Sequence, residues 1–399
     1  MKDLIRDFSL SALVAGLIAT LISYAGPLVI IFQAAKSAGL PDTAVSSWVW
    51  AISIGSGVLG ILLSLRYKVP LVIAWSAPGS ALLVALLPGI SLNEAVGAYL
   101  ASSLIIFLVG ISGAFDRVVG KLPPAISAAM LAGILFSFGT QLFVSLQAKP
   151  ALVLAMFVAY LLGKRLAPRY AVALVLLVGC AMAIGGGELN ASALVIGLAT
   201  PQWIAPEFSL HALLNIALPL VVVALTGQFV PGIAVLRNDG YQTPARPLIA
   251  SSALGTLLLA PFGCHGLNLA AITAAICTGR EAHEDPARRY VAGVVGGLAY
   301  LLLGLFGATL VSLFSAFPRE LIAALAGLAL FGAIGGALAG AMGVSEDREA
   351  ALITFLVTAS GMSLFGLSAA FWGLIFGIAA HLVLVRRRSL QREARAVRA

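Results

Sequence analysis

Long apolar stretches recur along the whole chain of 399 residues, and they limit its fold more than any other feature does. A helix needs roughly 20 mostly apolar residues to cross the hydrocarbon core of a bilayer. Dividing the chain at its charged residues and its Pro/Gly breaks gives fourteen apolar segments, at residues 9–33, 45–65, 70–87, 93–115, 124–146, 149–163, 168–185, 210–235, 246–262, 263–279, 289–314, 320–342, 348–364 and 366–385. Since hydrophobic side chains make up 61% of the sequence and charged ones only 10%, an ordinary soluble globular protein is excluded.

Three of these segments, 70–87, 246–262 and 263–279, are short for straight spanning helices. The sequence is therefore compatible with two arrangements: fourteen crossings, or twelve crossings with additional broken elements. In both, the sequence predicts an all-α integral membrane protein embedded in the lipid bilayer.

The basic residues indicate how the chain crosses the membrane. With the N-terminus in the cytoplasm, only Lys36, Lys149 and Arg319 of the 24 Lys and Arg residues fall outside. Cytoplasmic loops carry such an excess of positive charge, and a miscounted span would exchange every later loop. We therefore expect an even number of crossings, both termini in the cytoplasm and a basic cytoplasmic tail at residues 386–399.

The segments divide into two halves around an external linker at residues 191–210. Seven segments precede the linker and seven follow it, and an odd number per half places the halves in opposite orientations, as in an inverted repeat. The predicted domains are a first repeat at residues 1–190 and a second at residues 211–385. Within the linker, Leu194–Leu198 and Gln202-Trp203 are candidates for a helix lying at the membrane interface.

Proline and glycine interrupt the first half at two places. Gly26 and Pro27 interrupt the first segment, and Pro70–Trp75 in the third is too short and too β-branched for a helix. Pro78, followed by Gly79, suits the first turn of a helix that starts near Ser76. The third segment is therefore predicted to be a short strand that leads into a half-helix.

The second half repeats this pattern. Pro231 and Gly232 are predicted to break the eighth segment, and Pro261 and Gly263 open a stretch that mirrors the third segment. Two half-helices that meet near the bilayer midplane would direct free N–H groups and positive dipole ends at one point. We therefore predict an anion site there that needs no buried Lys or Arg.

Titratable residues are nearly absent from the predicted membrane interior. All sixteen acidic residues fall in loops, in tails or at the ends of spans, whereas cation carriers and proton pumps usually place Asp or Glu inside the bundle. This absence indicates an anionic substrate. Of the four histidines, only His265 is expected deep in the protein.

Three stretches of the sequence, Ala74–Gly79, Pro231–Arg237 and Pro261–Gly279, resemble the bacterial benzoate:proton symporters. The resemblance extends over nearly the whole chain. It implies import of benzoate with a proton across the bacterial inner membrane, and the seven-plus-seven inverted-repeat fold of nucleobase permeases and sulfate-type anion carriers. In that fold a core domain moves against a gate domain, and dimers occur among its members, which makes a homodimer a further expectation.

Substrate contacts are predicted at the breaks and in the matching motifs. The candidates are Tyr24, Ser76, Ala77, Gln228, His265, Gly266 and Asn268. The ordinary pKa of a histidine, about 6.5, makes both protonation states of His265 accessible, and a bound carboxylate would favour the imidazolium. His265 is therefore also the candidate for proton coupling.

Each candidate has a structural alternative. His265 could be a neutral imidazole bonded to a backbone carbonyl, and Gln228 and Asn268 could form interhelical hydrogen bonds. Ser76 could act only as a helix N-cap, and Tyr24 could simply line the bundle.

Other classes of function lack their motifs. No P-loop, dinucleotide fingerprint, catalytic triad or metal motif occurs in the sequence, so we expect no enzyme activity, no cofactor and no metal. The net charge of +8 is attributed to membrane topology, and no nucleic-acid partner is expected. The alternatives to a benzoate symporter are a carrier for a nucleobase or an inorganic anion, and a passive anion facilitator or channel.

Overall fold

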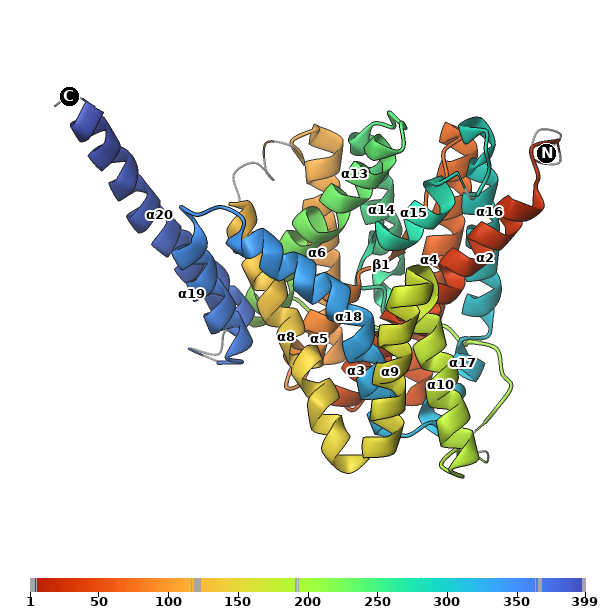
Figure 1. Ribbon diagram of the computed structural model, residues 1–399. Helices are drawn as coiled ribbons and strands as arrows, with labels where there is room; N and C mark the ends of the chain where they lie inside the picture. The colour runs from red at the N-terminus through yellow and green to blue at the C-terminus, as the bar shows by residue number, and fades with distance from the viewer. Residues whose placement is uncertain are drawn as a thin grey trace.

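The computed structural model describes residues 4, 6–115, 117, 123–190, 192, 194–280, 282–362, 364 and 368–396 (Figure 1). The ends of the predicted cytoplasmic tail and of the N-terminus, at residues 397–399 and 1–3, lie outside the described residues. Within the described ranges the protein is a bundle of helices around a two-stranded sheet.

The elements of the first half are α2 (Leu10–Ala25), α3 (Pro27–Ser37), α4 (Asp42–Tyr67), β1 (Ile73–Trp75), α5 (Ala77–Leu86), α6 (Leu92–Ser112), α8 (Pro124–Ala148), α9 (Pro150–Leu166), η1 (Pro168–Tyr170) and α10 (Ala171–Gly185). Those of the second half are α11 (Leu210–Ala212), η3 (Leu213–Ala217), α12 (Leu218–Ala224), η4 (Leu225–Phe229), α13 (Val230–Asn238), α14 (Ala245–Leu259), η5 (Ala260–Phe262), β2 (Leu267–Leu269), α15 (Ile272–Thr278), η6 (Pro286–Arg288), α16 (Tyr290–Leu305), α17 (Gly307–Ala316), α18 (Arg319–Met342), α19 (Arg348–Ala359) and α20 (Ala369–Ala396). A helix or a strand-plus-helix unit thus occupies every predicted apolar segment.

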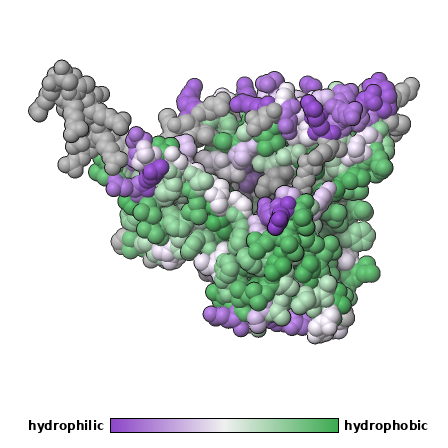
Figure 2. Space-filling view, in the orientation of Figure 1, coloured by the Kyte–Doolittle hydropathy of each residue, from purple (hydrophilic) through white to green (hydrophobic). Residues whose placement is uncertain are grey.

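Eight helices in the described part of the chain are long and apolar enough to cross a membrane. Their outward surface forms an apolar band, and hydrophilic residues gather along the upper edge in Figure 2. Exposure of an apolar surface of this extent to water would be unfavourable, so the protein is a multi-pass membrane protein. The start of α2 and the end of α20 lie on the same side of the bundle, as an even number of crossings requires (Figure 1). The number of crossings, the inverted repeat and the cytoplasmic location of the termini stay predictions.

Both predicted units of strand plus half-helix are present. β1 leads into α5, and β2 leads into α15, which begins three residues after Leu269. The strands pair antiparallel, with Ile73 opposite Leu269 and Trp75 opposite Leu267. This pairing satisfies backbone groups that would otherwise be exposed inside an apolar bundle, which is why non-helical backbone is tolerated there.

The prediction that Pro231 and Gly232 break the eighth segment is wrong. The chain is continuously helical from α11 to α13, and a π turn, η4, precedes Pro231. A second π turn, η3, likewise precedes Pro219. A π turn shifts the hydrogen bonds by one residue, so that a proline ring and its missing N–H are accommodated without ending the helix. Gly26, in contrast, does separate α2 from α3, as predicted.

The predicted interfacial helix in the linker is absent, because residues 194–208 contain no helical turn. Their backbone groups bond to other elements instead. Ile204 N–H donates to the carbonyl of Pro261 at 2.8 Å, and Glu207 N–H donates to that of Asn93 at 3.0 Å. Since these partners satisfy the donors that a helix would use internally, the linker lies as an extended strap along the bundle.

The helices pack as two groups. In the first group α2 and α4 both pack on α16, α6 packs on α14, and α3 packs on α5. In the second group α8 packs on α18 and α19, α9 packs on α10, and α19 packs on α20. The two groups touch where α18 meets α3 and where α8 meets α5 and η4. This division is compatible with the predicted core and gate domains.

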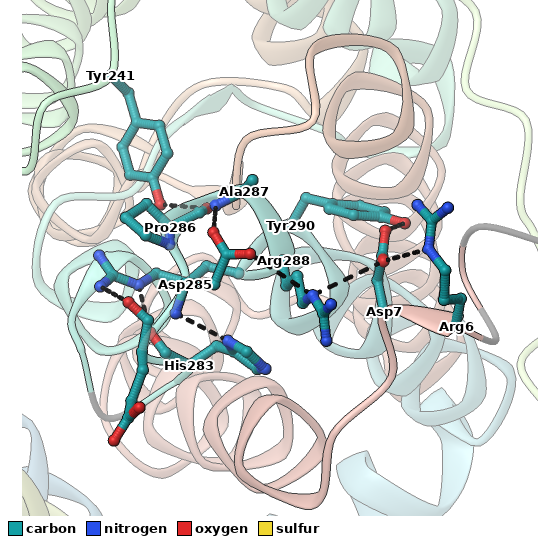
Figure 3. A network of polar contacts seen from close by, with 11 residues as sticks. Arg6, Asp7, Tyr241, His283, Asp285, Pro286, Ala287, Arg288 and Tyr290 are labelled. Carbon is teal, nitrogen blue, oxygen red and sulfur yellow. Dashed lines mark hydrogen bonds and ion pairs between the residues drawn. The ribbon is translucent and has the colours of Figure 1, made fainter.

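A polar network joins the start of the chain to the loop between α15 and α16 (Figure 3). The Asp7 carboxylate accepts hydrogen bonds from Arg6 Nε and from Tyr290 Oη, each at 3.1 Å, and Arg288 Nε lies 3.9 Å away. The hydrogen bond from Arg6 holds the pKa of Asp7 below its ordinary value of 3.8. Arg289 donates to the carbonyl of Thr278 at the end of α15 and to two carbonyls of the following loop, so charge-assisted bonds stabilise this end of the bundle.

Candidate substrate-binding site

The backbone before His265 is bent by a glycine. Gly263 follows η5 and has a φ of +99°, a conformation that residues with a side chain rarely adopt. A Cβ atom at this position would overlap the indole of Trp48, which is itself fully buried. Only glycine therefore allows the chain to turn here and to place His265 beside the start of α5.

The His265 side chain is bonded to the first turns of α5. Its Nε2 atom lies 2.9 Å from Ser80 Oγ, and Ser80 Oγ donates to the carbonyl of Ser76 at 2.8 Å. A hydroxyl has one proton, so when Ser80 directs it to Ser76, the imidazole Nε2 is the donor to Ser80. Neutral His265 then carries its hydrogen on Nε2, and Nδ1, which is buried without a hydrogen bond, is the atom that can take up a proton.

Ser76 also caps α5, as predicted. Its side chain accepts a hydrogen bond from Gly79 N–H at 2.9 Å, and Pro78 lies in the first turn of the helix. The positive end of the α5 dipole therefore lies next to His265.

A small cavity lies beside His265, between β2 and helices α6, α12 and α14. It is lined by four of the predicted residues, Ser76, His265, Gly266 and Asn268, and by Ser102, Ser103, Thr256 and apolar side chains. Its volume of about 10 Å³ is close to what one water molecule requires, so an aromatic acid does not fit in this conformation. The candidate site is thus closed, with His265 and Asn268 only 3% and 2% exposed.

Asn268 lies in β2, where its backbone faces Ala74 of β1. Its side-chain Nδ2 is buried and forms no hydrogen bond within the described residues, which does not support the alternative of interhelical bonding. Thr256 Oγ1 accepts from Leu267 N–H at 2.8 Å and so fixes this strand to α14. The unpaired amide of Asn268 is available to a ligand, because an unsatisfied buried donor is costly.

Three predicted contacts do not line this cavity. Tyr24 donates to Ser53 Oγ, and its ring lies 5.4 Å from that of Trp75 and 5.8 Å from that of Tyr300. This aromatic cluster matches the alternative in which Tyr24 lines the bundle. Ala77 is half-buried at the start of α5, and Gln228 is half-buried on η4, which packs against β2.

The register of β1 on β2 places the two half-helices at opposite ends of the strand pair. Trp75, just before α5, pairs with Leu267, whereas Leu269, just before α15, pairs with Ile73. In this register the strand ends Trp75 and Leu269 are two residue steps, or roughly 7 Å, apart along the strands, and the convergence of the two helix starts on one point stays a prediction. Only the start of α5 reaches the cavity.

The sequence did not indicate several other residues in and around this site. Ser80 bonds to His265, and Ser102 and Ser103 bring hydroxyls from α6, each donating to the carbonyl of Tyr99. The Tyr99 ring lies 6.1 Å from the imidazole. Hydroxyl residues inside otherwise apolar spans were the available signal. In the part of the chain that the structure describes, no three His, Cys, Asp or Glu side chains gather, so no residues are assigned to a metal.

Comparisons with known proteins agree with this architecture. The transmembrane domain of a cyanobacterium bicarbonate transporter superposes with a TM-score of 0.60 at 17% identity, covering 93% of this chain and 98% of that one, which shows a shared fold. In sequence, the chain is 50% identical to a benzoate membrane transport protein of Acinetobacter baylyi over 98% of this chain and 99% of that protein. It is 44% identical to the inner membrane protein YdcO of Escherichia coli over 93% of this chain and 95% of that protein.

A family model described as benzoate membrane transport protein matches residues 6–383. The match spans both halves of the bundle, and the two relatives are similar over almost their full lengths. The chain therefore belongs to the benzoate membrane transport protein family.

Proposed function

We propose that this protein imports benzoate, or a similar aromatic monocarboxylate, together with a proton across the bacterial inner membrane. The relative from Acinetobacter baylyi supports the choice of substrate by its name. The observation that carries the proposal is the placement of His265, a buried imidazole with a free Nδ1 atom beside the N-terminus of α5.

The hydrogen bonds of His265 support the proposed proton coupling. With Nε2 bonded to Ser80, the proton binds at Nδ1 and turns the imidazole into a cation beside the positive end of α5. Such a cation is unfavourable in an empty, buried cavity and is stabilised by a carboxylate. The proton and the anion thus each favour the binding of the other, and the empty carrier releases both.

Alternating access requires the closed cavity to open on each side of the membrane in turn. The proposed movement is a displacement of the group that contains α5, β1 and β2 against the group that contains α8 and α18. The candidate contacts Tyr24, Ala77 and Gln228 are proposed to meet the substrate only after this movement.

The coupling can be tested through its energetics. One monoanion carried with one proton moves no net charge, so uptake into vesicles should follow the pH gradient at about 1.4 kcal/mol per pH unit. It should gain nothing from a membrane potential, which would otherwise supply about 2.3 kcal/mol per charge per 100 mV. Strong uptake driven by a valinomycin-clamped potential alone would contradict one-to-one symport.

The role of His265 is tested by its replacement. His265→Ala and His265→Gln should abolish accumulation driven by the pH gradient in reconstituted vesicles, while the thermal stability of the His265→Gln protein stays near that of the wild type. Unchanged uptake in both variants would refute the proposed role. Competition by benzoate, uracil and bicarbonate identifies the substrate class, and the absence of accumulation against a gradient would indicate a facilitator or channel.

A further inference from the structure

A second and much larger cavity lies between the two groups of helices. Its volume is about 570 Å³, and its walls come from α3, α8, α17 and α18. None of its lining residues belongs to the cavity beside His265. It lies near the end of α3 and the start of α18, where Lys36 and Arg319 are placed on the outer side by the predicted topology.

The floor of this outer cavity is aromatic. Phe32, Phe138 and Phe314 line it and are each less than 10% exposed. The rings of Phe32 and Phe314 are stacked, with their centroids 4.5 Å apart and their planes inclined by 28°. Such a surface favours a planar ring, which can stack or lie edge-on against these side chains.

The rim of the cavity is cationic and polar. Lys36 and Arg319 line it and are exposed, and they are two of the three basic residues that the charge bias places outside. Among the described residues, neither forms an ion pair within 4.0 Å. Asp42 also lines the cavity, and the positive charge of Lys36 is attracted by Glu320 and repelled by Arg319.

Two further features suit a carboxylate at this rim. Gln33, Ser137 and Gln141 supply side-chain donors. Arg319 is also the first residue of α18, whose N-terminus has no side-chain cap, so a positive helix end lies at the same edge.

From this arrangement we propose that the outer cavity is a capture site for aromatic monocarboxylates, in which Lys36 and Arg319 hold the carboxylate and the phenylalanine floor receives the ring. The inference rests on the proposed import of such acids. The site concentrates the anion at the outer entrance before the inner cavity opens. It therefore lowers the KM of uptake without taking part in proton coupling.

Direct binding separates this site from the proposed transport site. Saturation-transfer NMR of benzoate with purified His265→Ala protein should show ring signals, because the outer cavity is intact. The signals should become weaker when Lys36→Gln and Arg319→Gln are added. They should persist when Lys149→Gln is added, because Lys149 is paired with Glu188 at 2.7 Å and does not line the cavity.

Uptake kinetics give the second measurement. Exposed ion pairs contribute modestly, so loss of both cations should raise the KM for benzoate about twofold to thirtyfold and leave the maximal rate unchanged. The effect should shrink between about 0.01 M and 0.15 M ionic strength, where the Debye length falls from about 30 to about 8 Å. Lys36→Arg and Arg319→Lys, which keep the charges, should restore most of the affinity.

The results that would overturn the inference are distinct from those that would overturn the transport function. Absent ring signals with the His265→Ala protein, or equal signals with and without Lys36 and Arg319, would refute the capture site. So would a KM change in the Lys149→Gln control as large as that in the double variant. A wild-type protein that binds benzoate at the rim but does not take it up would instead refute the proposed transport.

Discussion

Gly263 offers the sharpest test of how the fold positions His265. Its φ of +99° and its contact with Trp48 leave no space for a side chain, and the imidazole follows two residues later. Gly240 is a matched control, because its φ of +89° is similar but a Cβ atom there would have nothing within 4 Å. Substitution of each by alanine therefore separates backbone strain from steric overlap.

The expected magnitudes follow from these two surroundings. Alanine in a left-handed conformation costs roughly 1–2 kcal/mol, and this cost applies to both Gly263→Ala and Gly240→Ala. Overpacking against a buried indole adds about 1–3 kcal/mol at Gly263 alone. Gly263→Ala should thus lower the free energy of unfolding by about 2–5 kcal/mol, and Gly240→Ala by about 1–2 kcal/mol.

The assay is the thermal unfolding of purified protein in detergent for both variants, for Trp48→Leu and for Trp48→Leu combined with Gly263→Ala. The melting temperature should fall further for Gly263→Ala than for Gly240→Ala. Trp48→Leu should lower the free energy of unfolding less in the Gly263→Ala background than in the wild type, because it removes the overlap between the added Cβ atom and the indole. Equal effects of the two alanines, or additive effects of Trp48→Leu and Gly263→Ala, would refute the reasoning.

Three further substitutions test single contacts. Ser76→Ala should lower the free energy of unfolding by about 1 kcal/mol but Ser76→Gly by only a few tenths, as expected when an N-cap residue is replaced. If both variants lost benzoate uptake in vesicles to the same extent, Ser76 would also contact the substrate. Ser80→Ala should leave the buried Nε2–H of His265 unpaired, cost about 1–3 kcal/mol in thermal unfolding and change the pH profile of uptake, whereas Ser80→Thr should preserve both. Asp7→Asn should lower the melting temperature at neutral pH. Because the pKa of Asp7 is lowered in the folded protein, the ionised carboxylate stabilises the fold above about pH 3.8, and this stabilisation is lost as the pH falls. The melting temperatures of the wild type and the variant should therefore converge in acid. A difference between them that persists at low pH would assign the loss to the hydrogen bond from Tyr290 rather than to charge.

The sequence alone determined the features that depend on local composition and short-range geometry. Apolar segments longer than about 20 residues specify where the chain must be helical, whatever surrounds them. The β-branched run before Trp75, with Ser76 as N-cap and Pro78 in the first turn, specifies a strand that ends in a helix start, because both signals act within a few residues. The depth of His265 followed from the same hydrophobic pattern.

Contacts between distant residues were decided only by the tertiary structure. His265 and Ser80 are 185 positions apart, and no local signal indicates that their side chains meet. The register of β1 on β2 likewise depends on pairs such as Ile73 and Leu269, which are far apart in the sequence. At Pro231, a π turn replaced the predicted break, because the surrounding helices favour a continuous helix over an exposed backbone.

The outer cavity shows the same division. The charge bias predicted that Lys36 and Arg319 lie on the outer side, but the sequence could not predict that both line one aromatic cavity. Hydrophobicity determines which residues enter the membrane, since each side chain contributes to that transfer independently. Packing determines which of these residues meet, since it depends on how all the helices fit together. The composition of the cavity beside His265 and its closed state were therefore decided only by the tertiary structure.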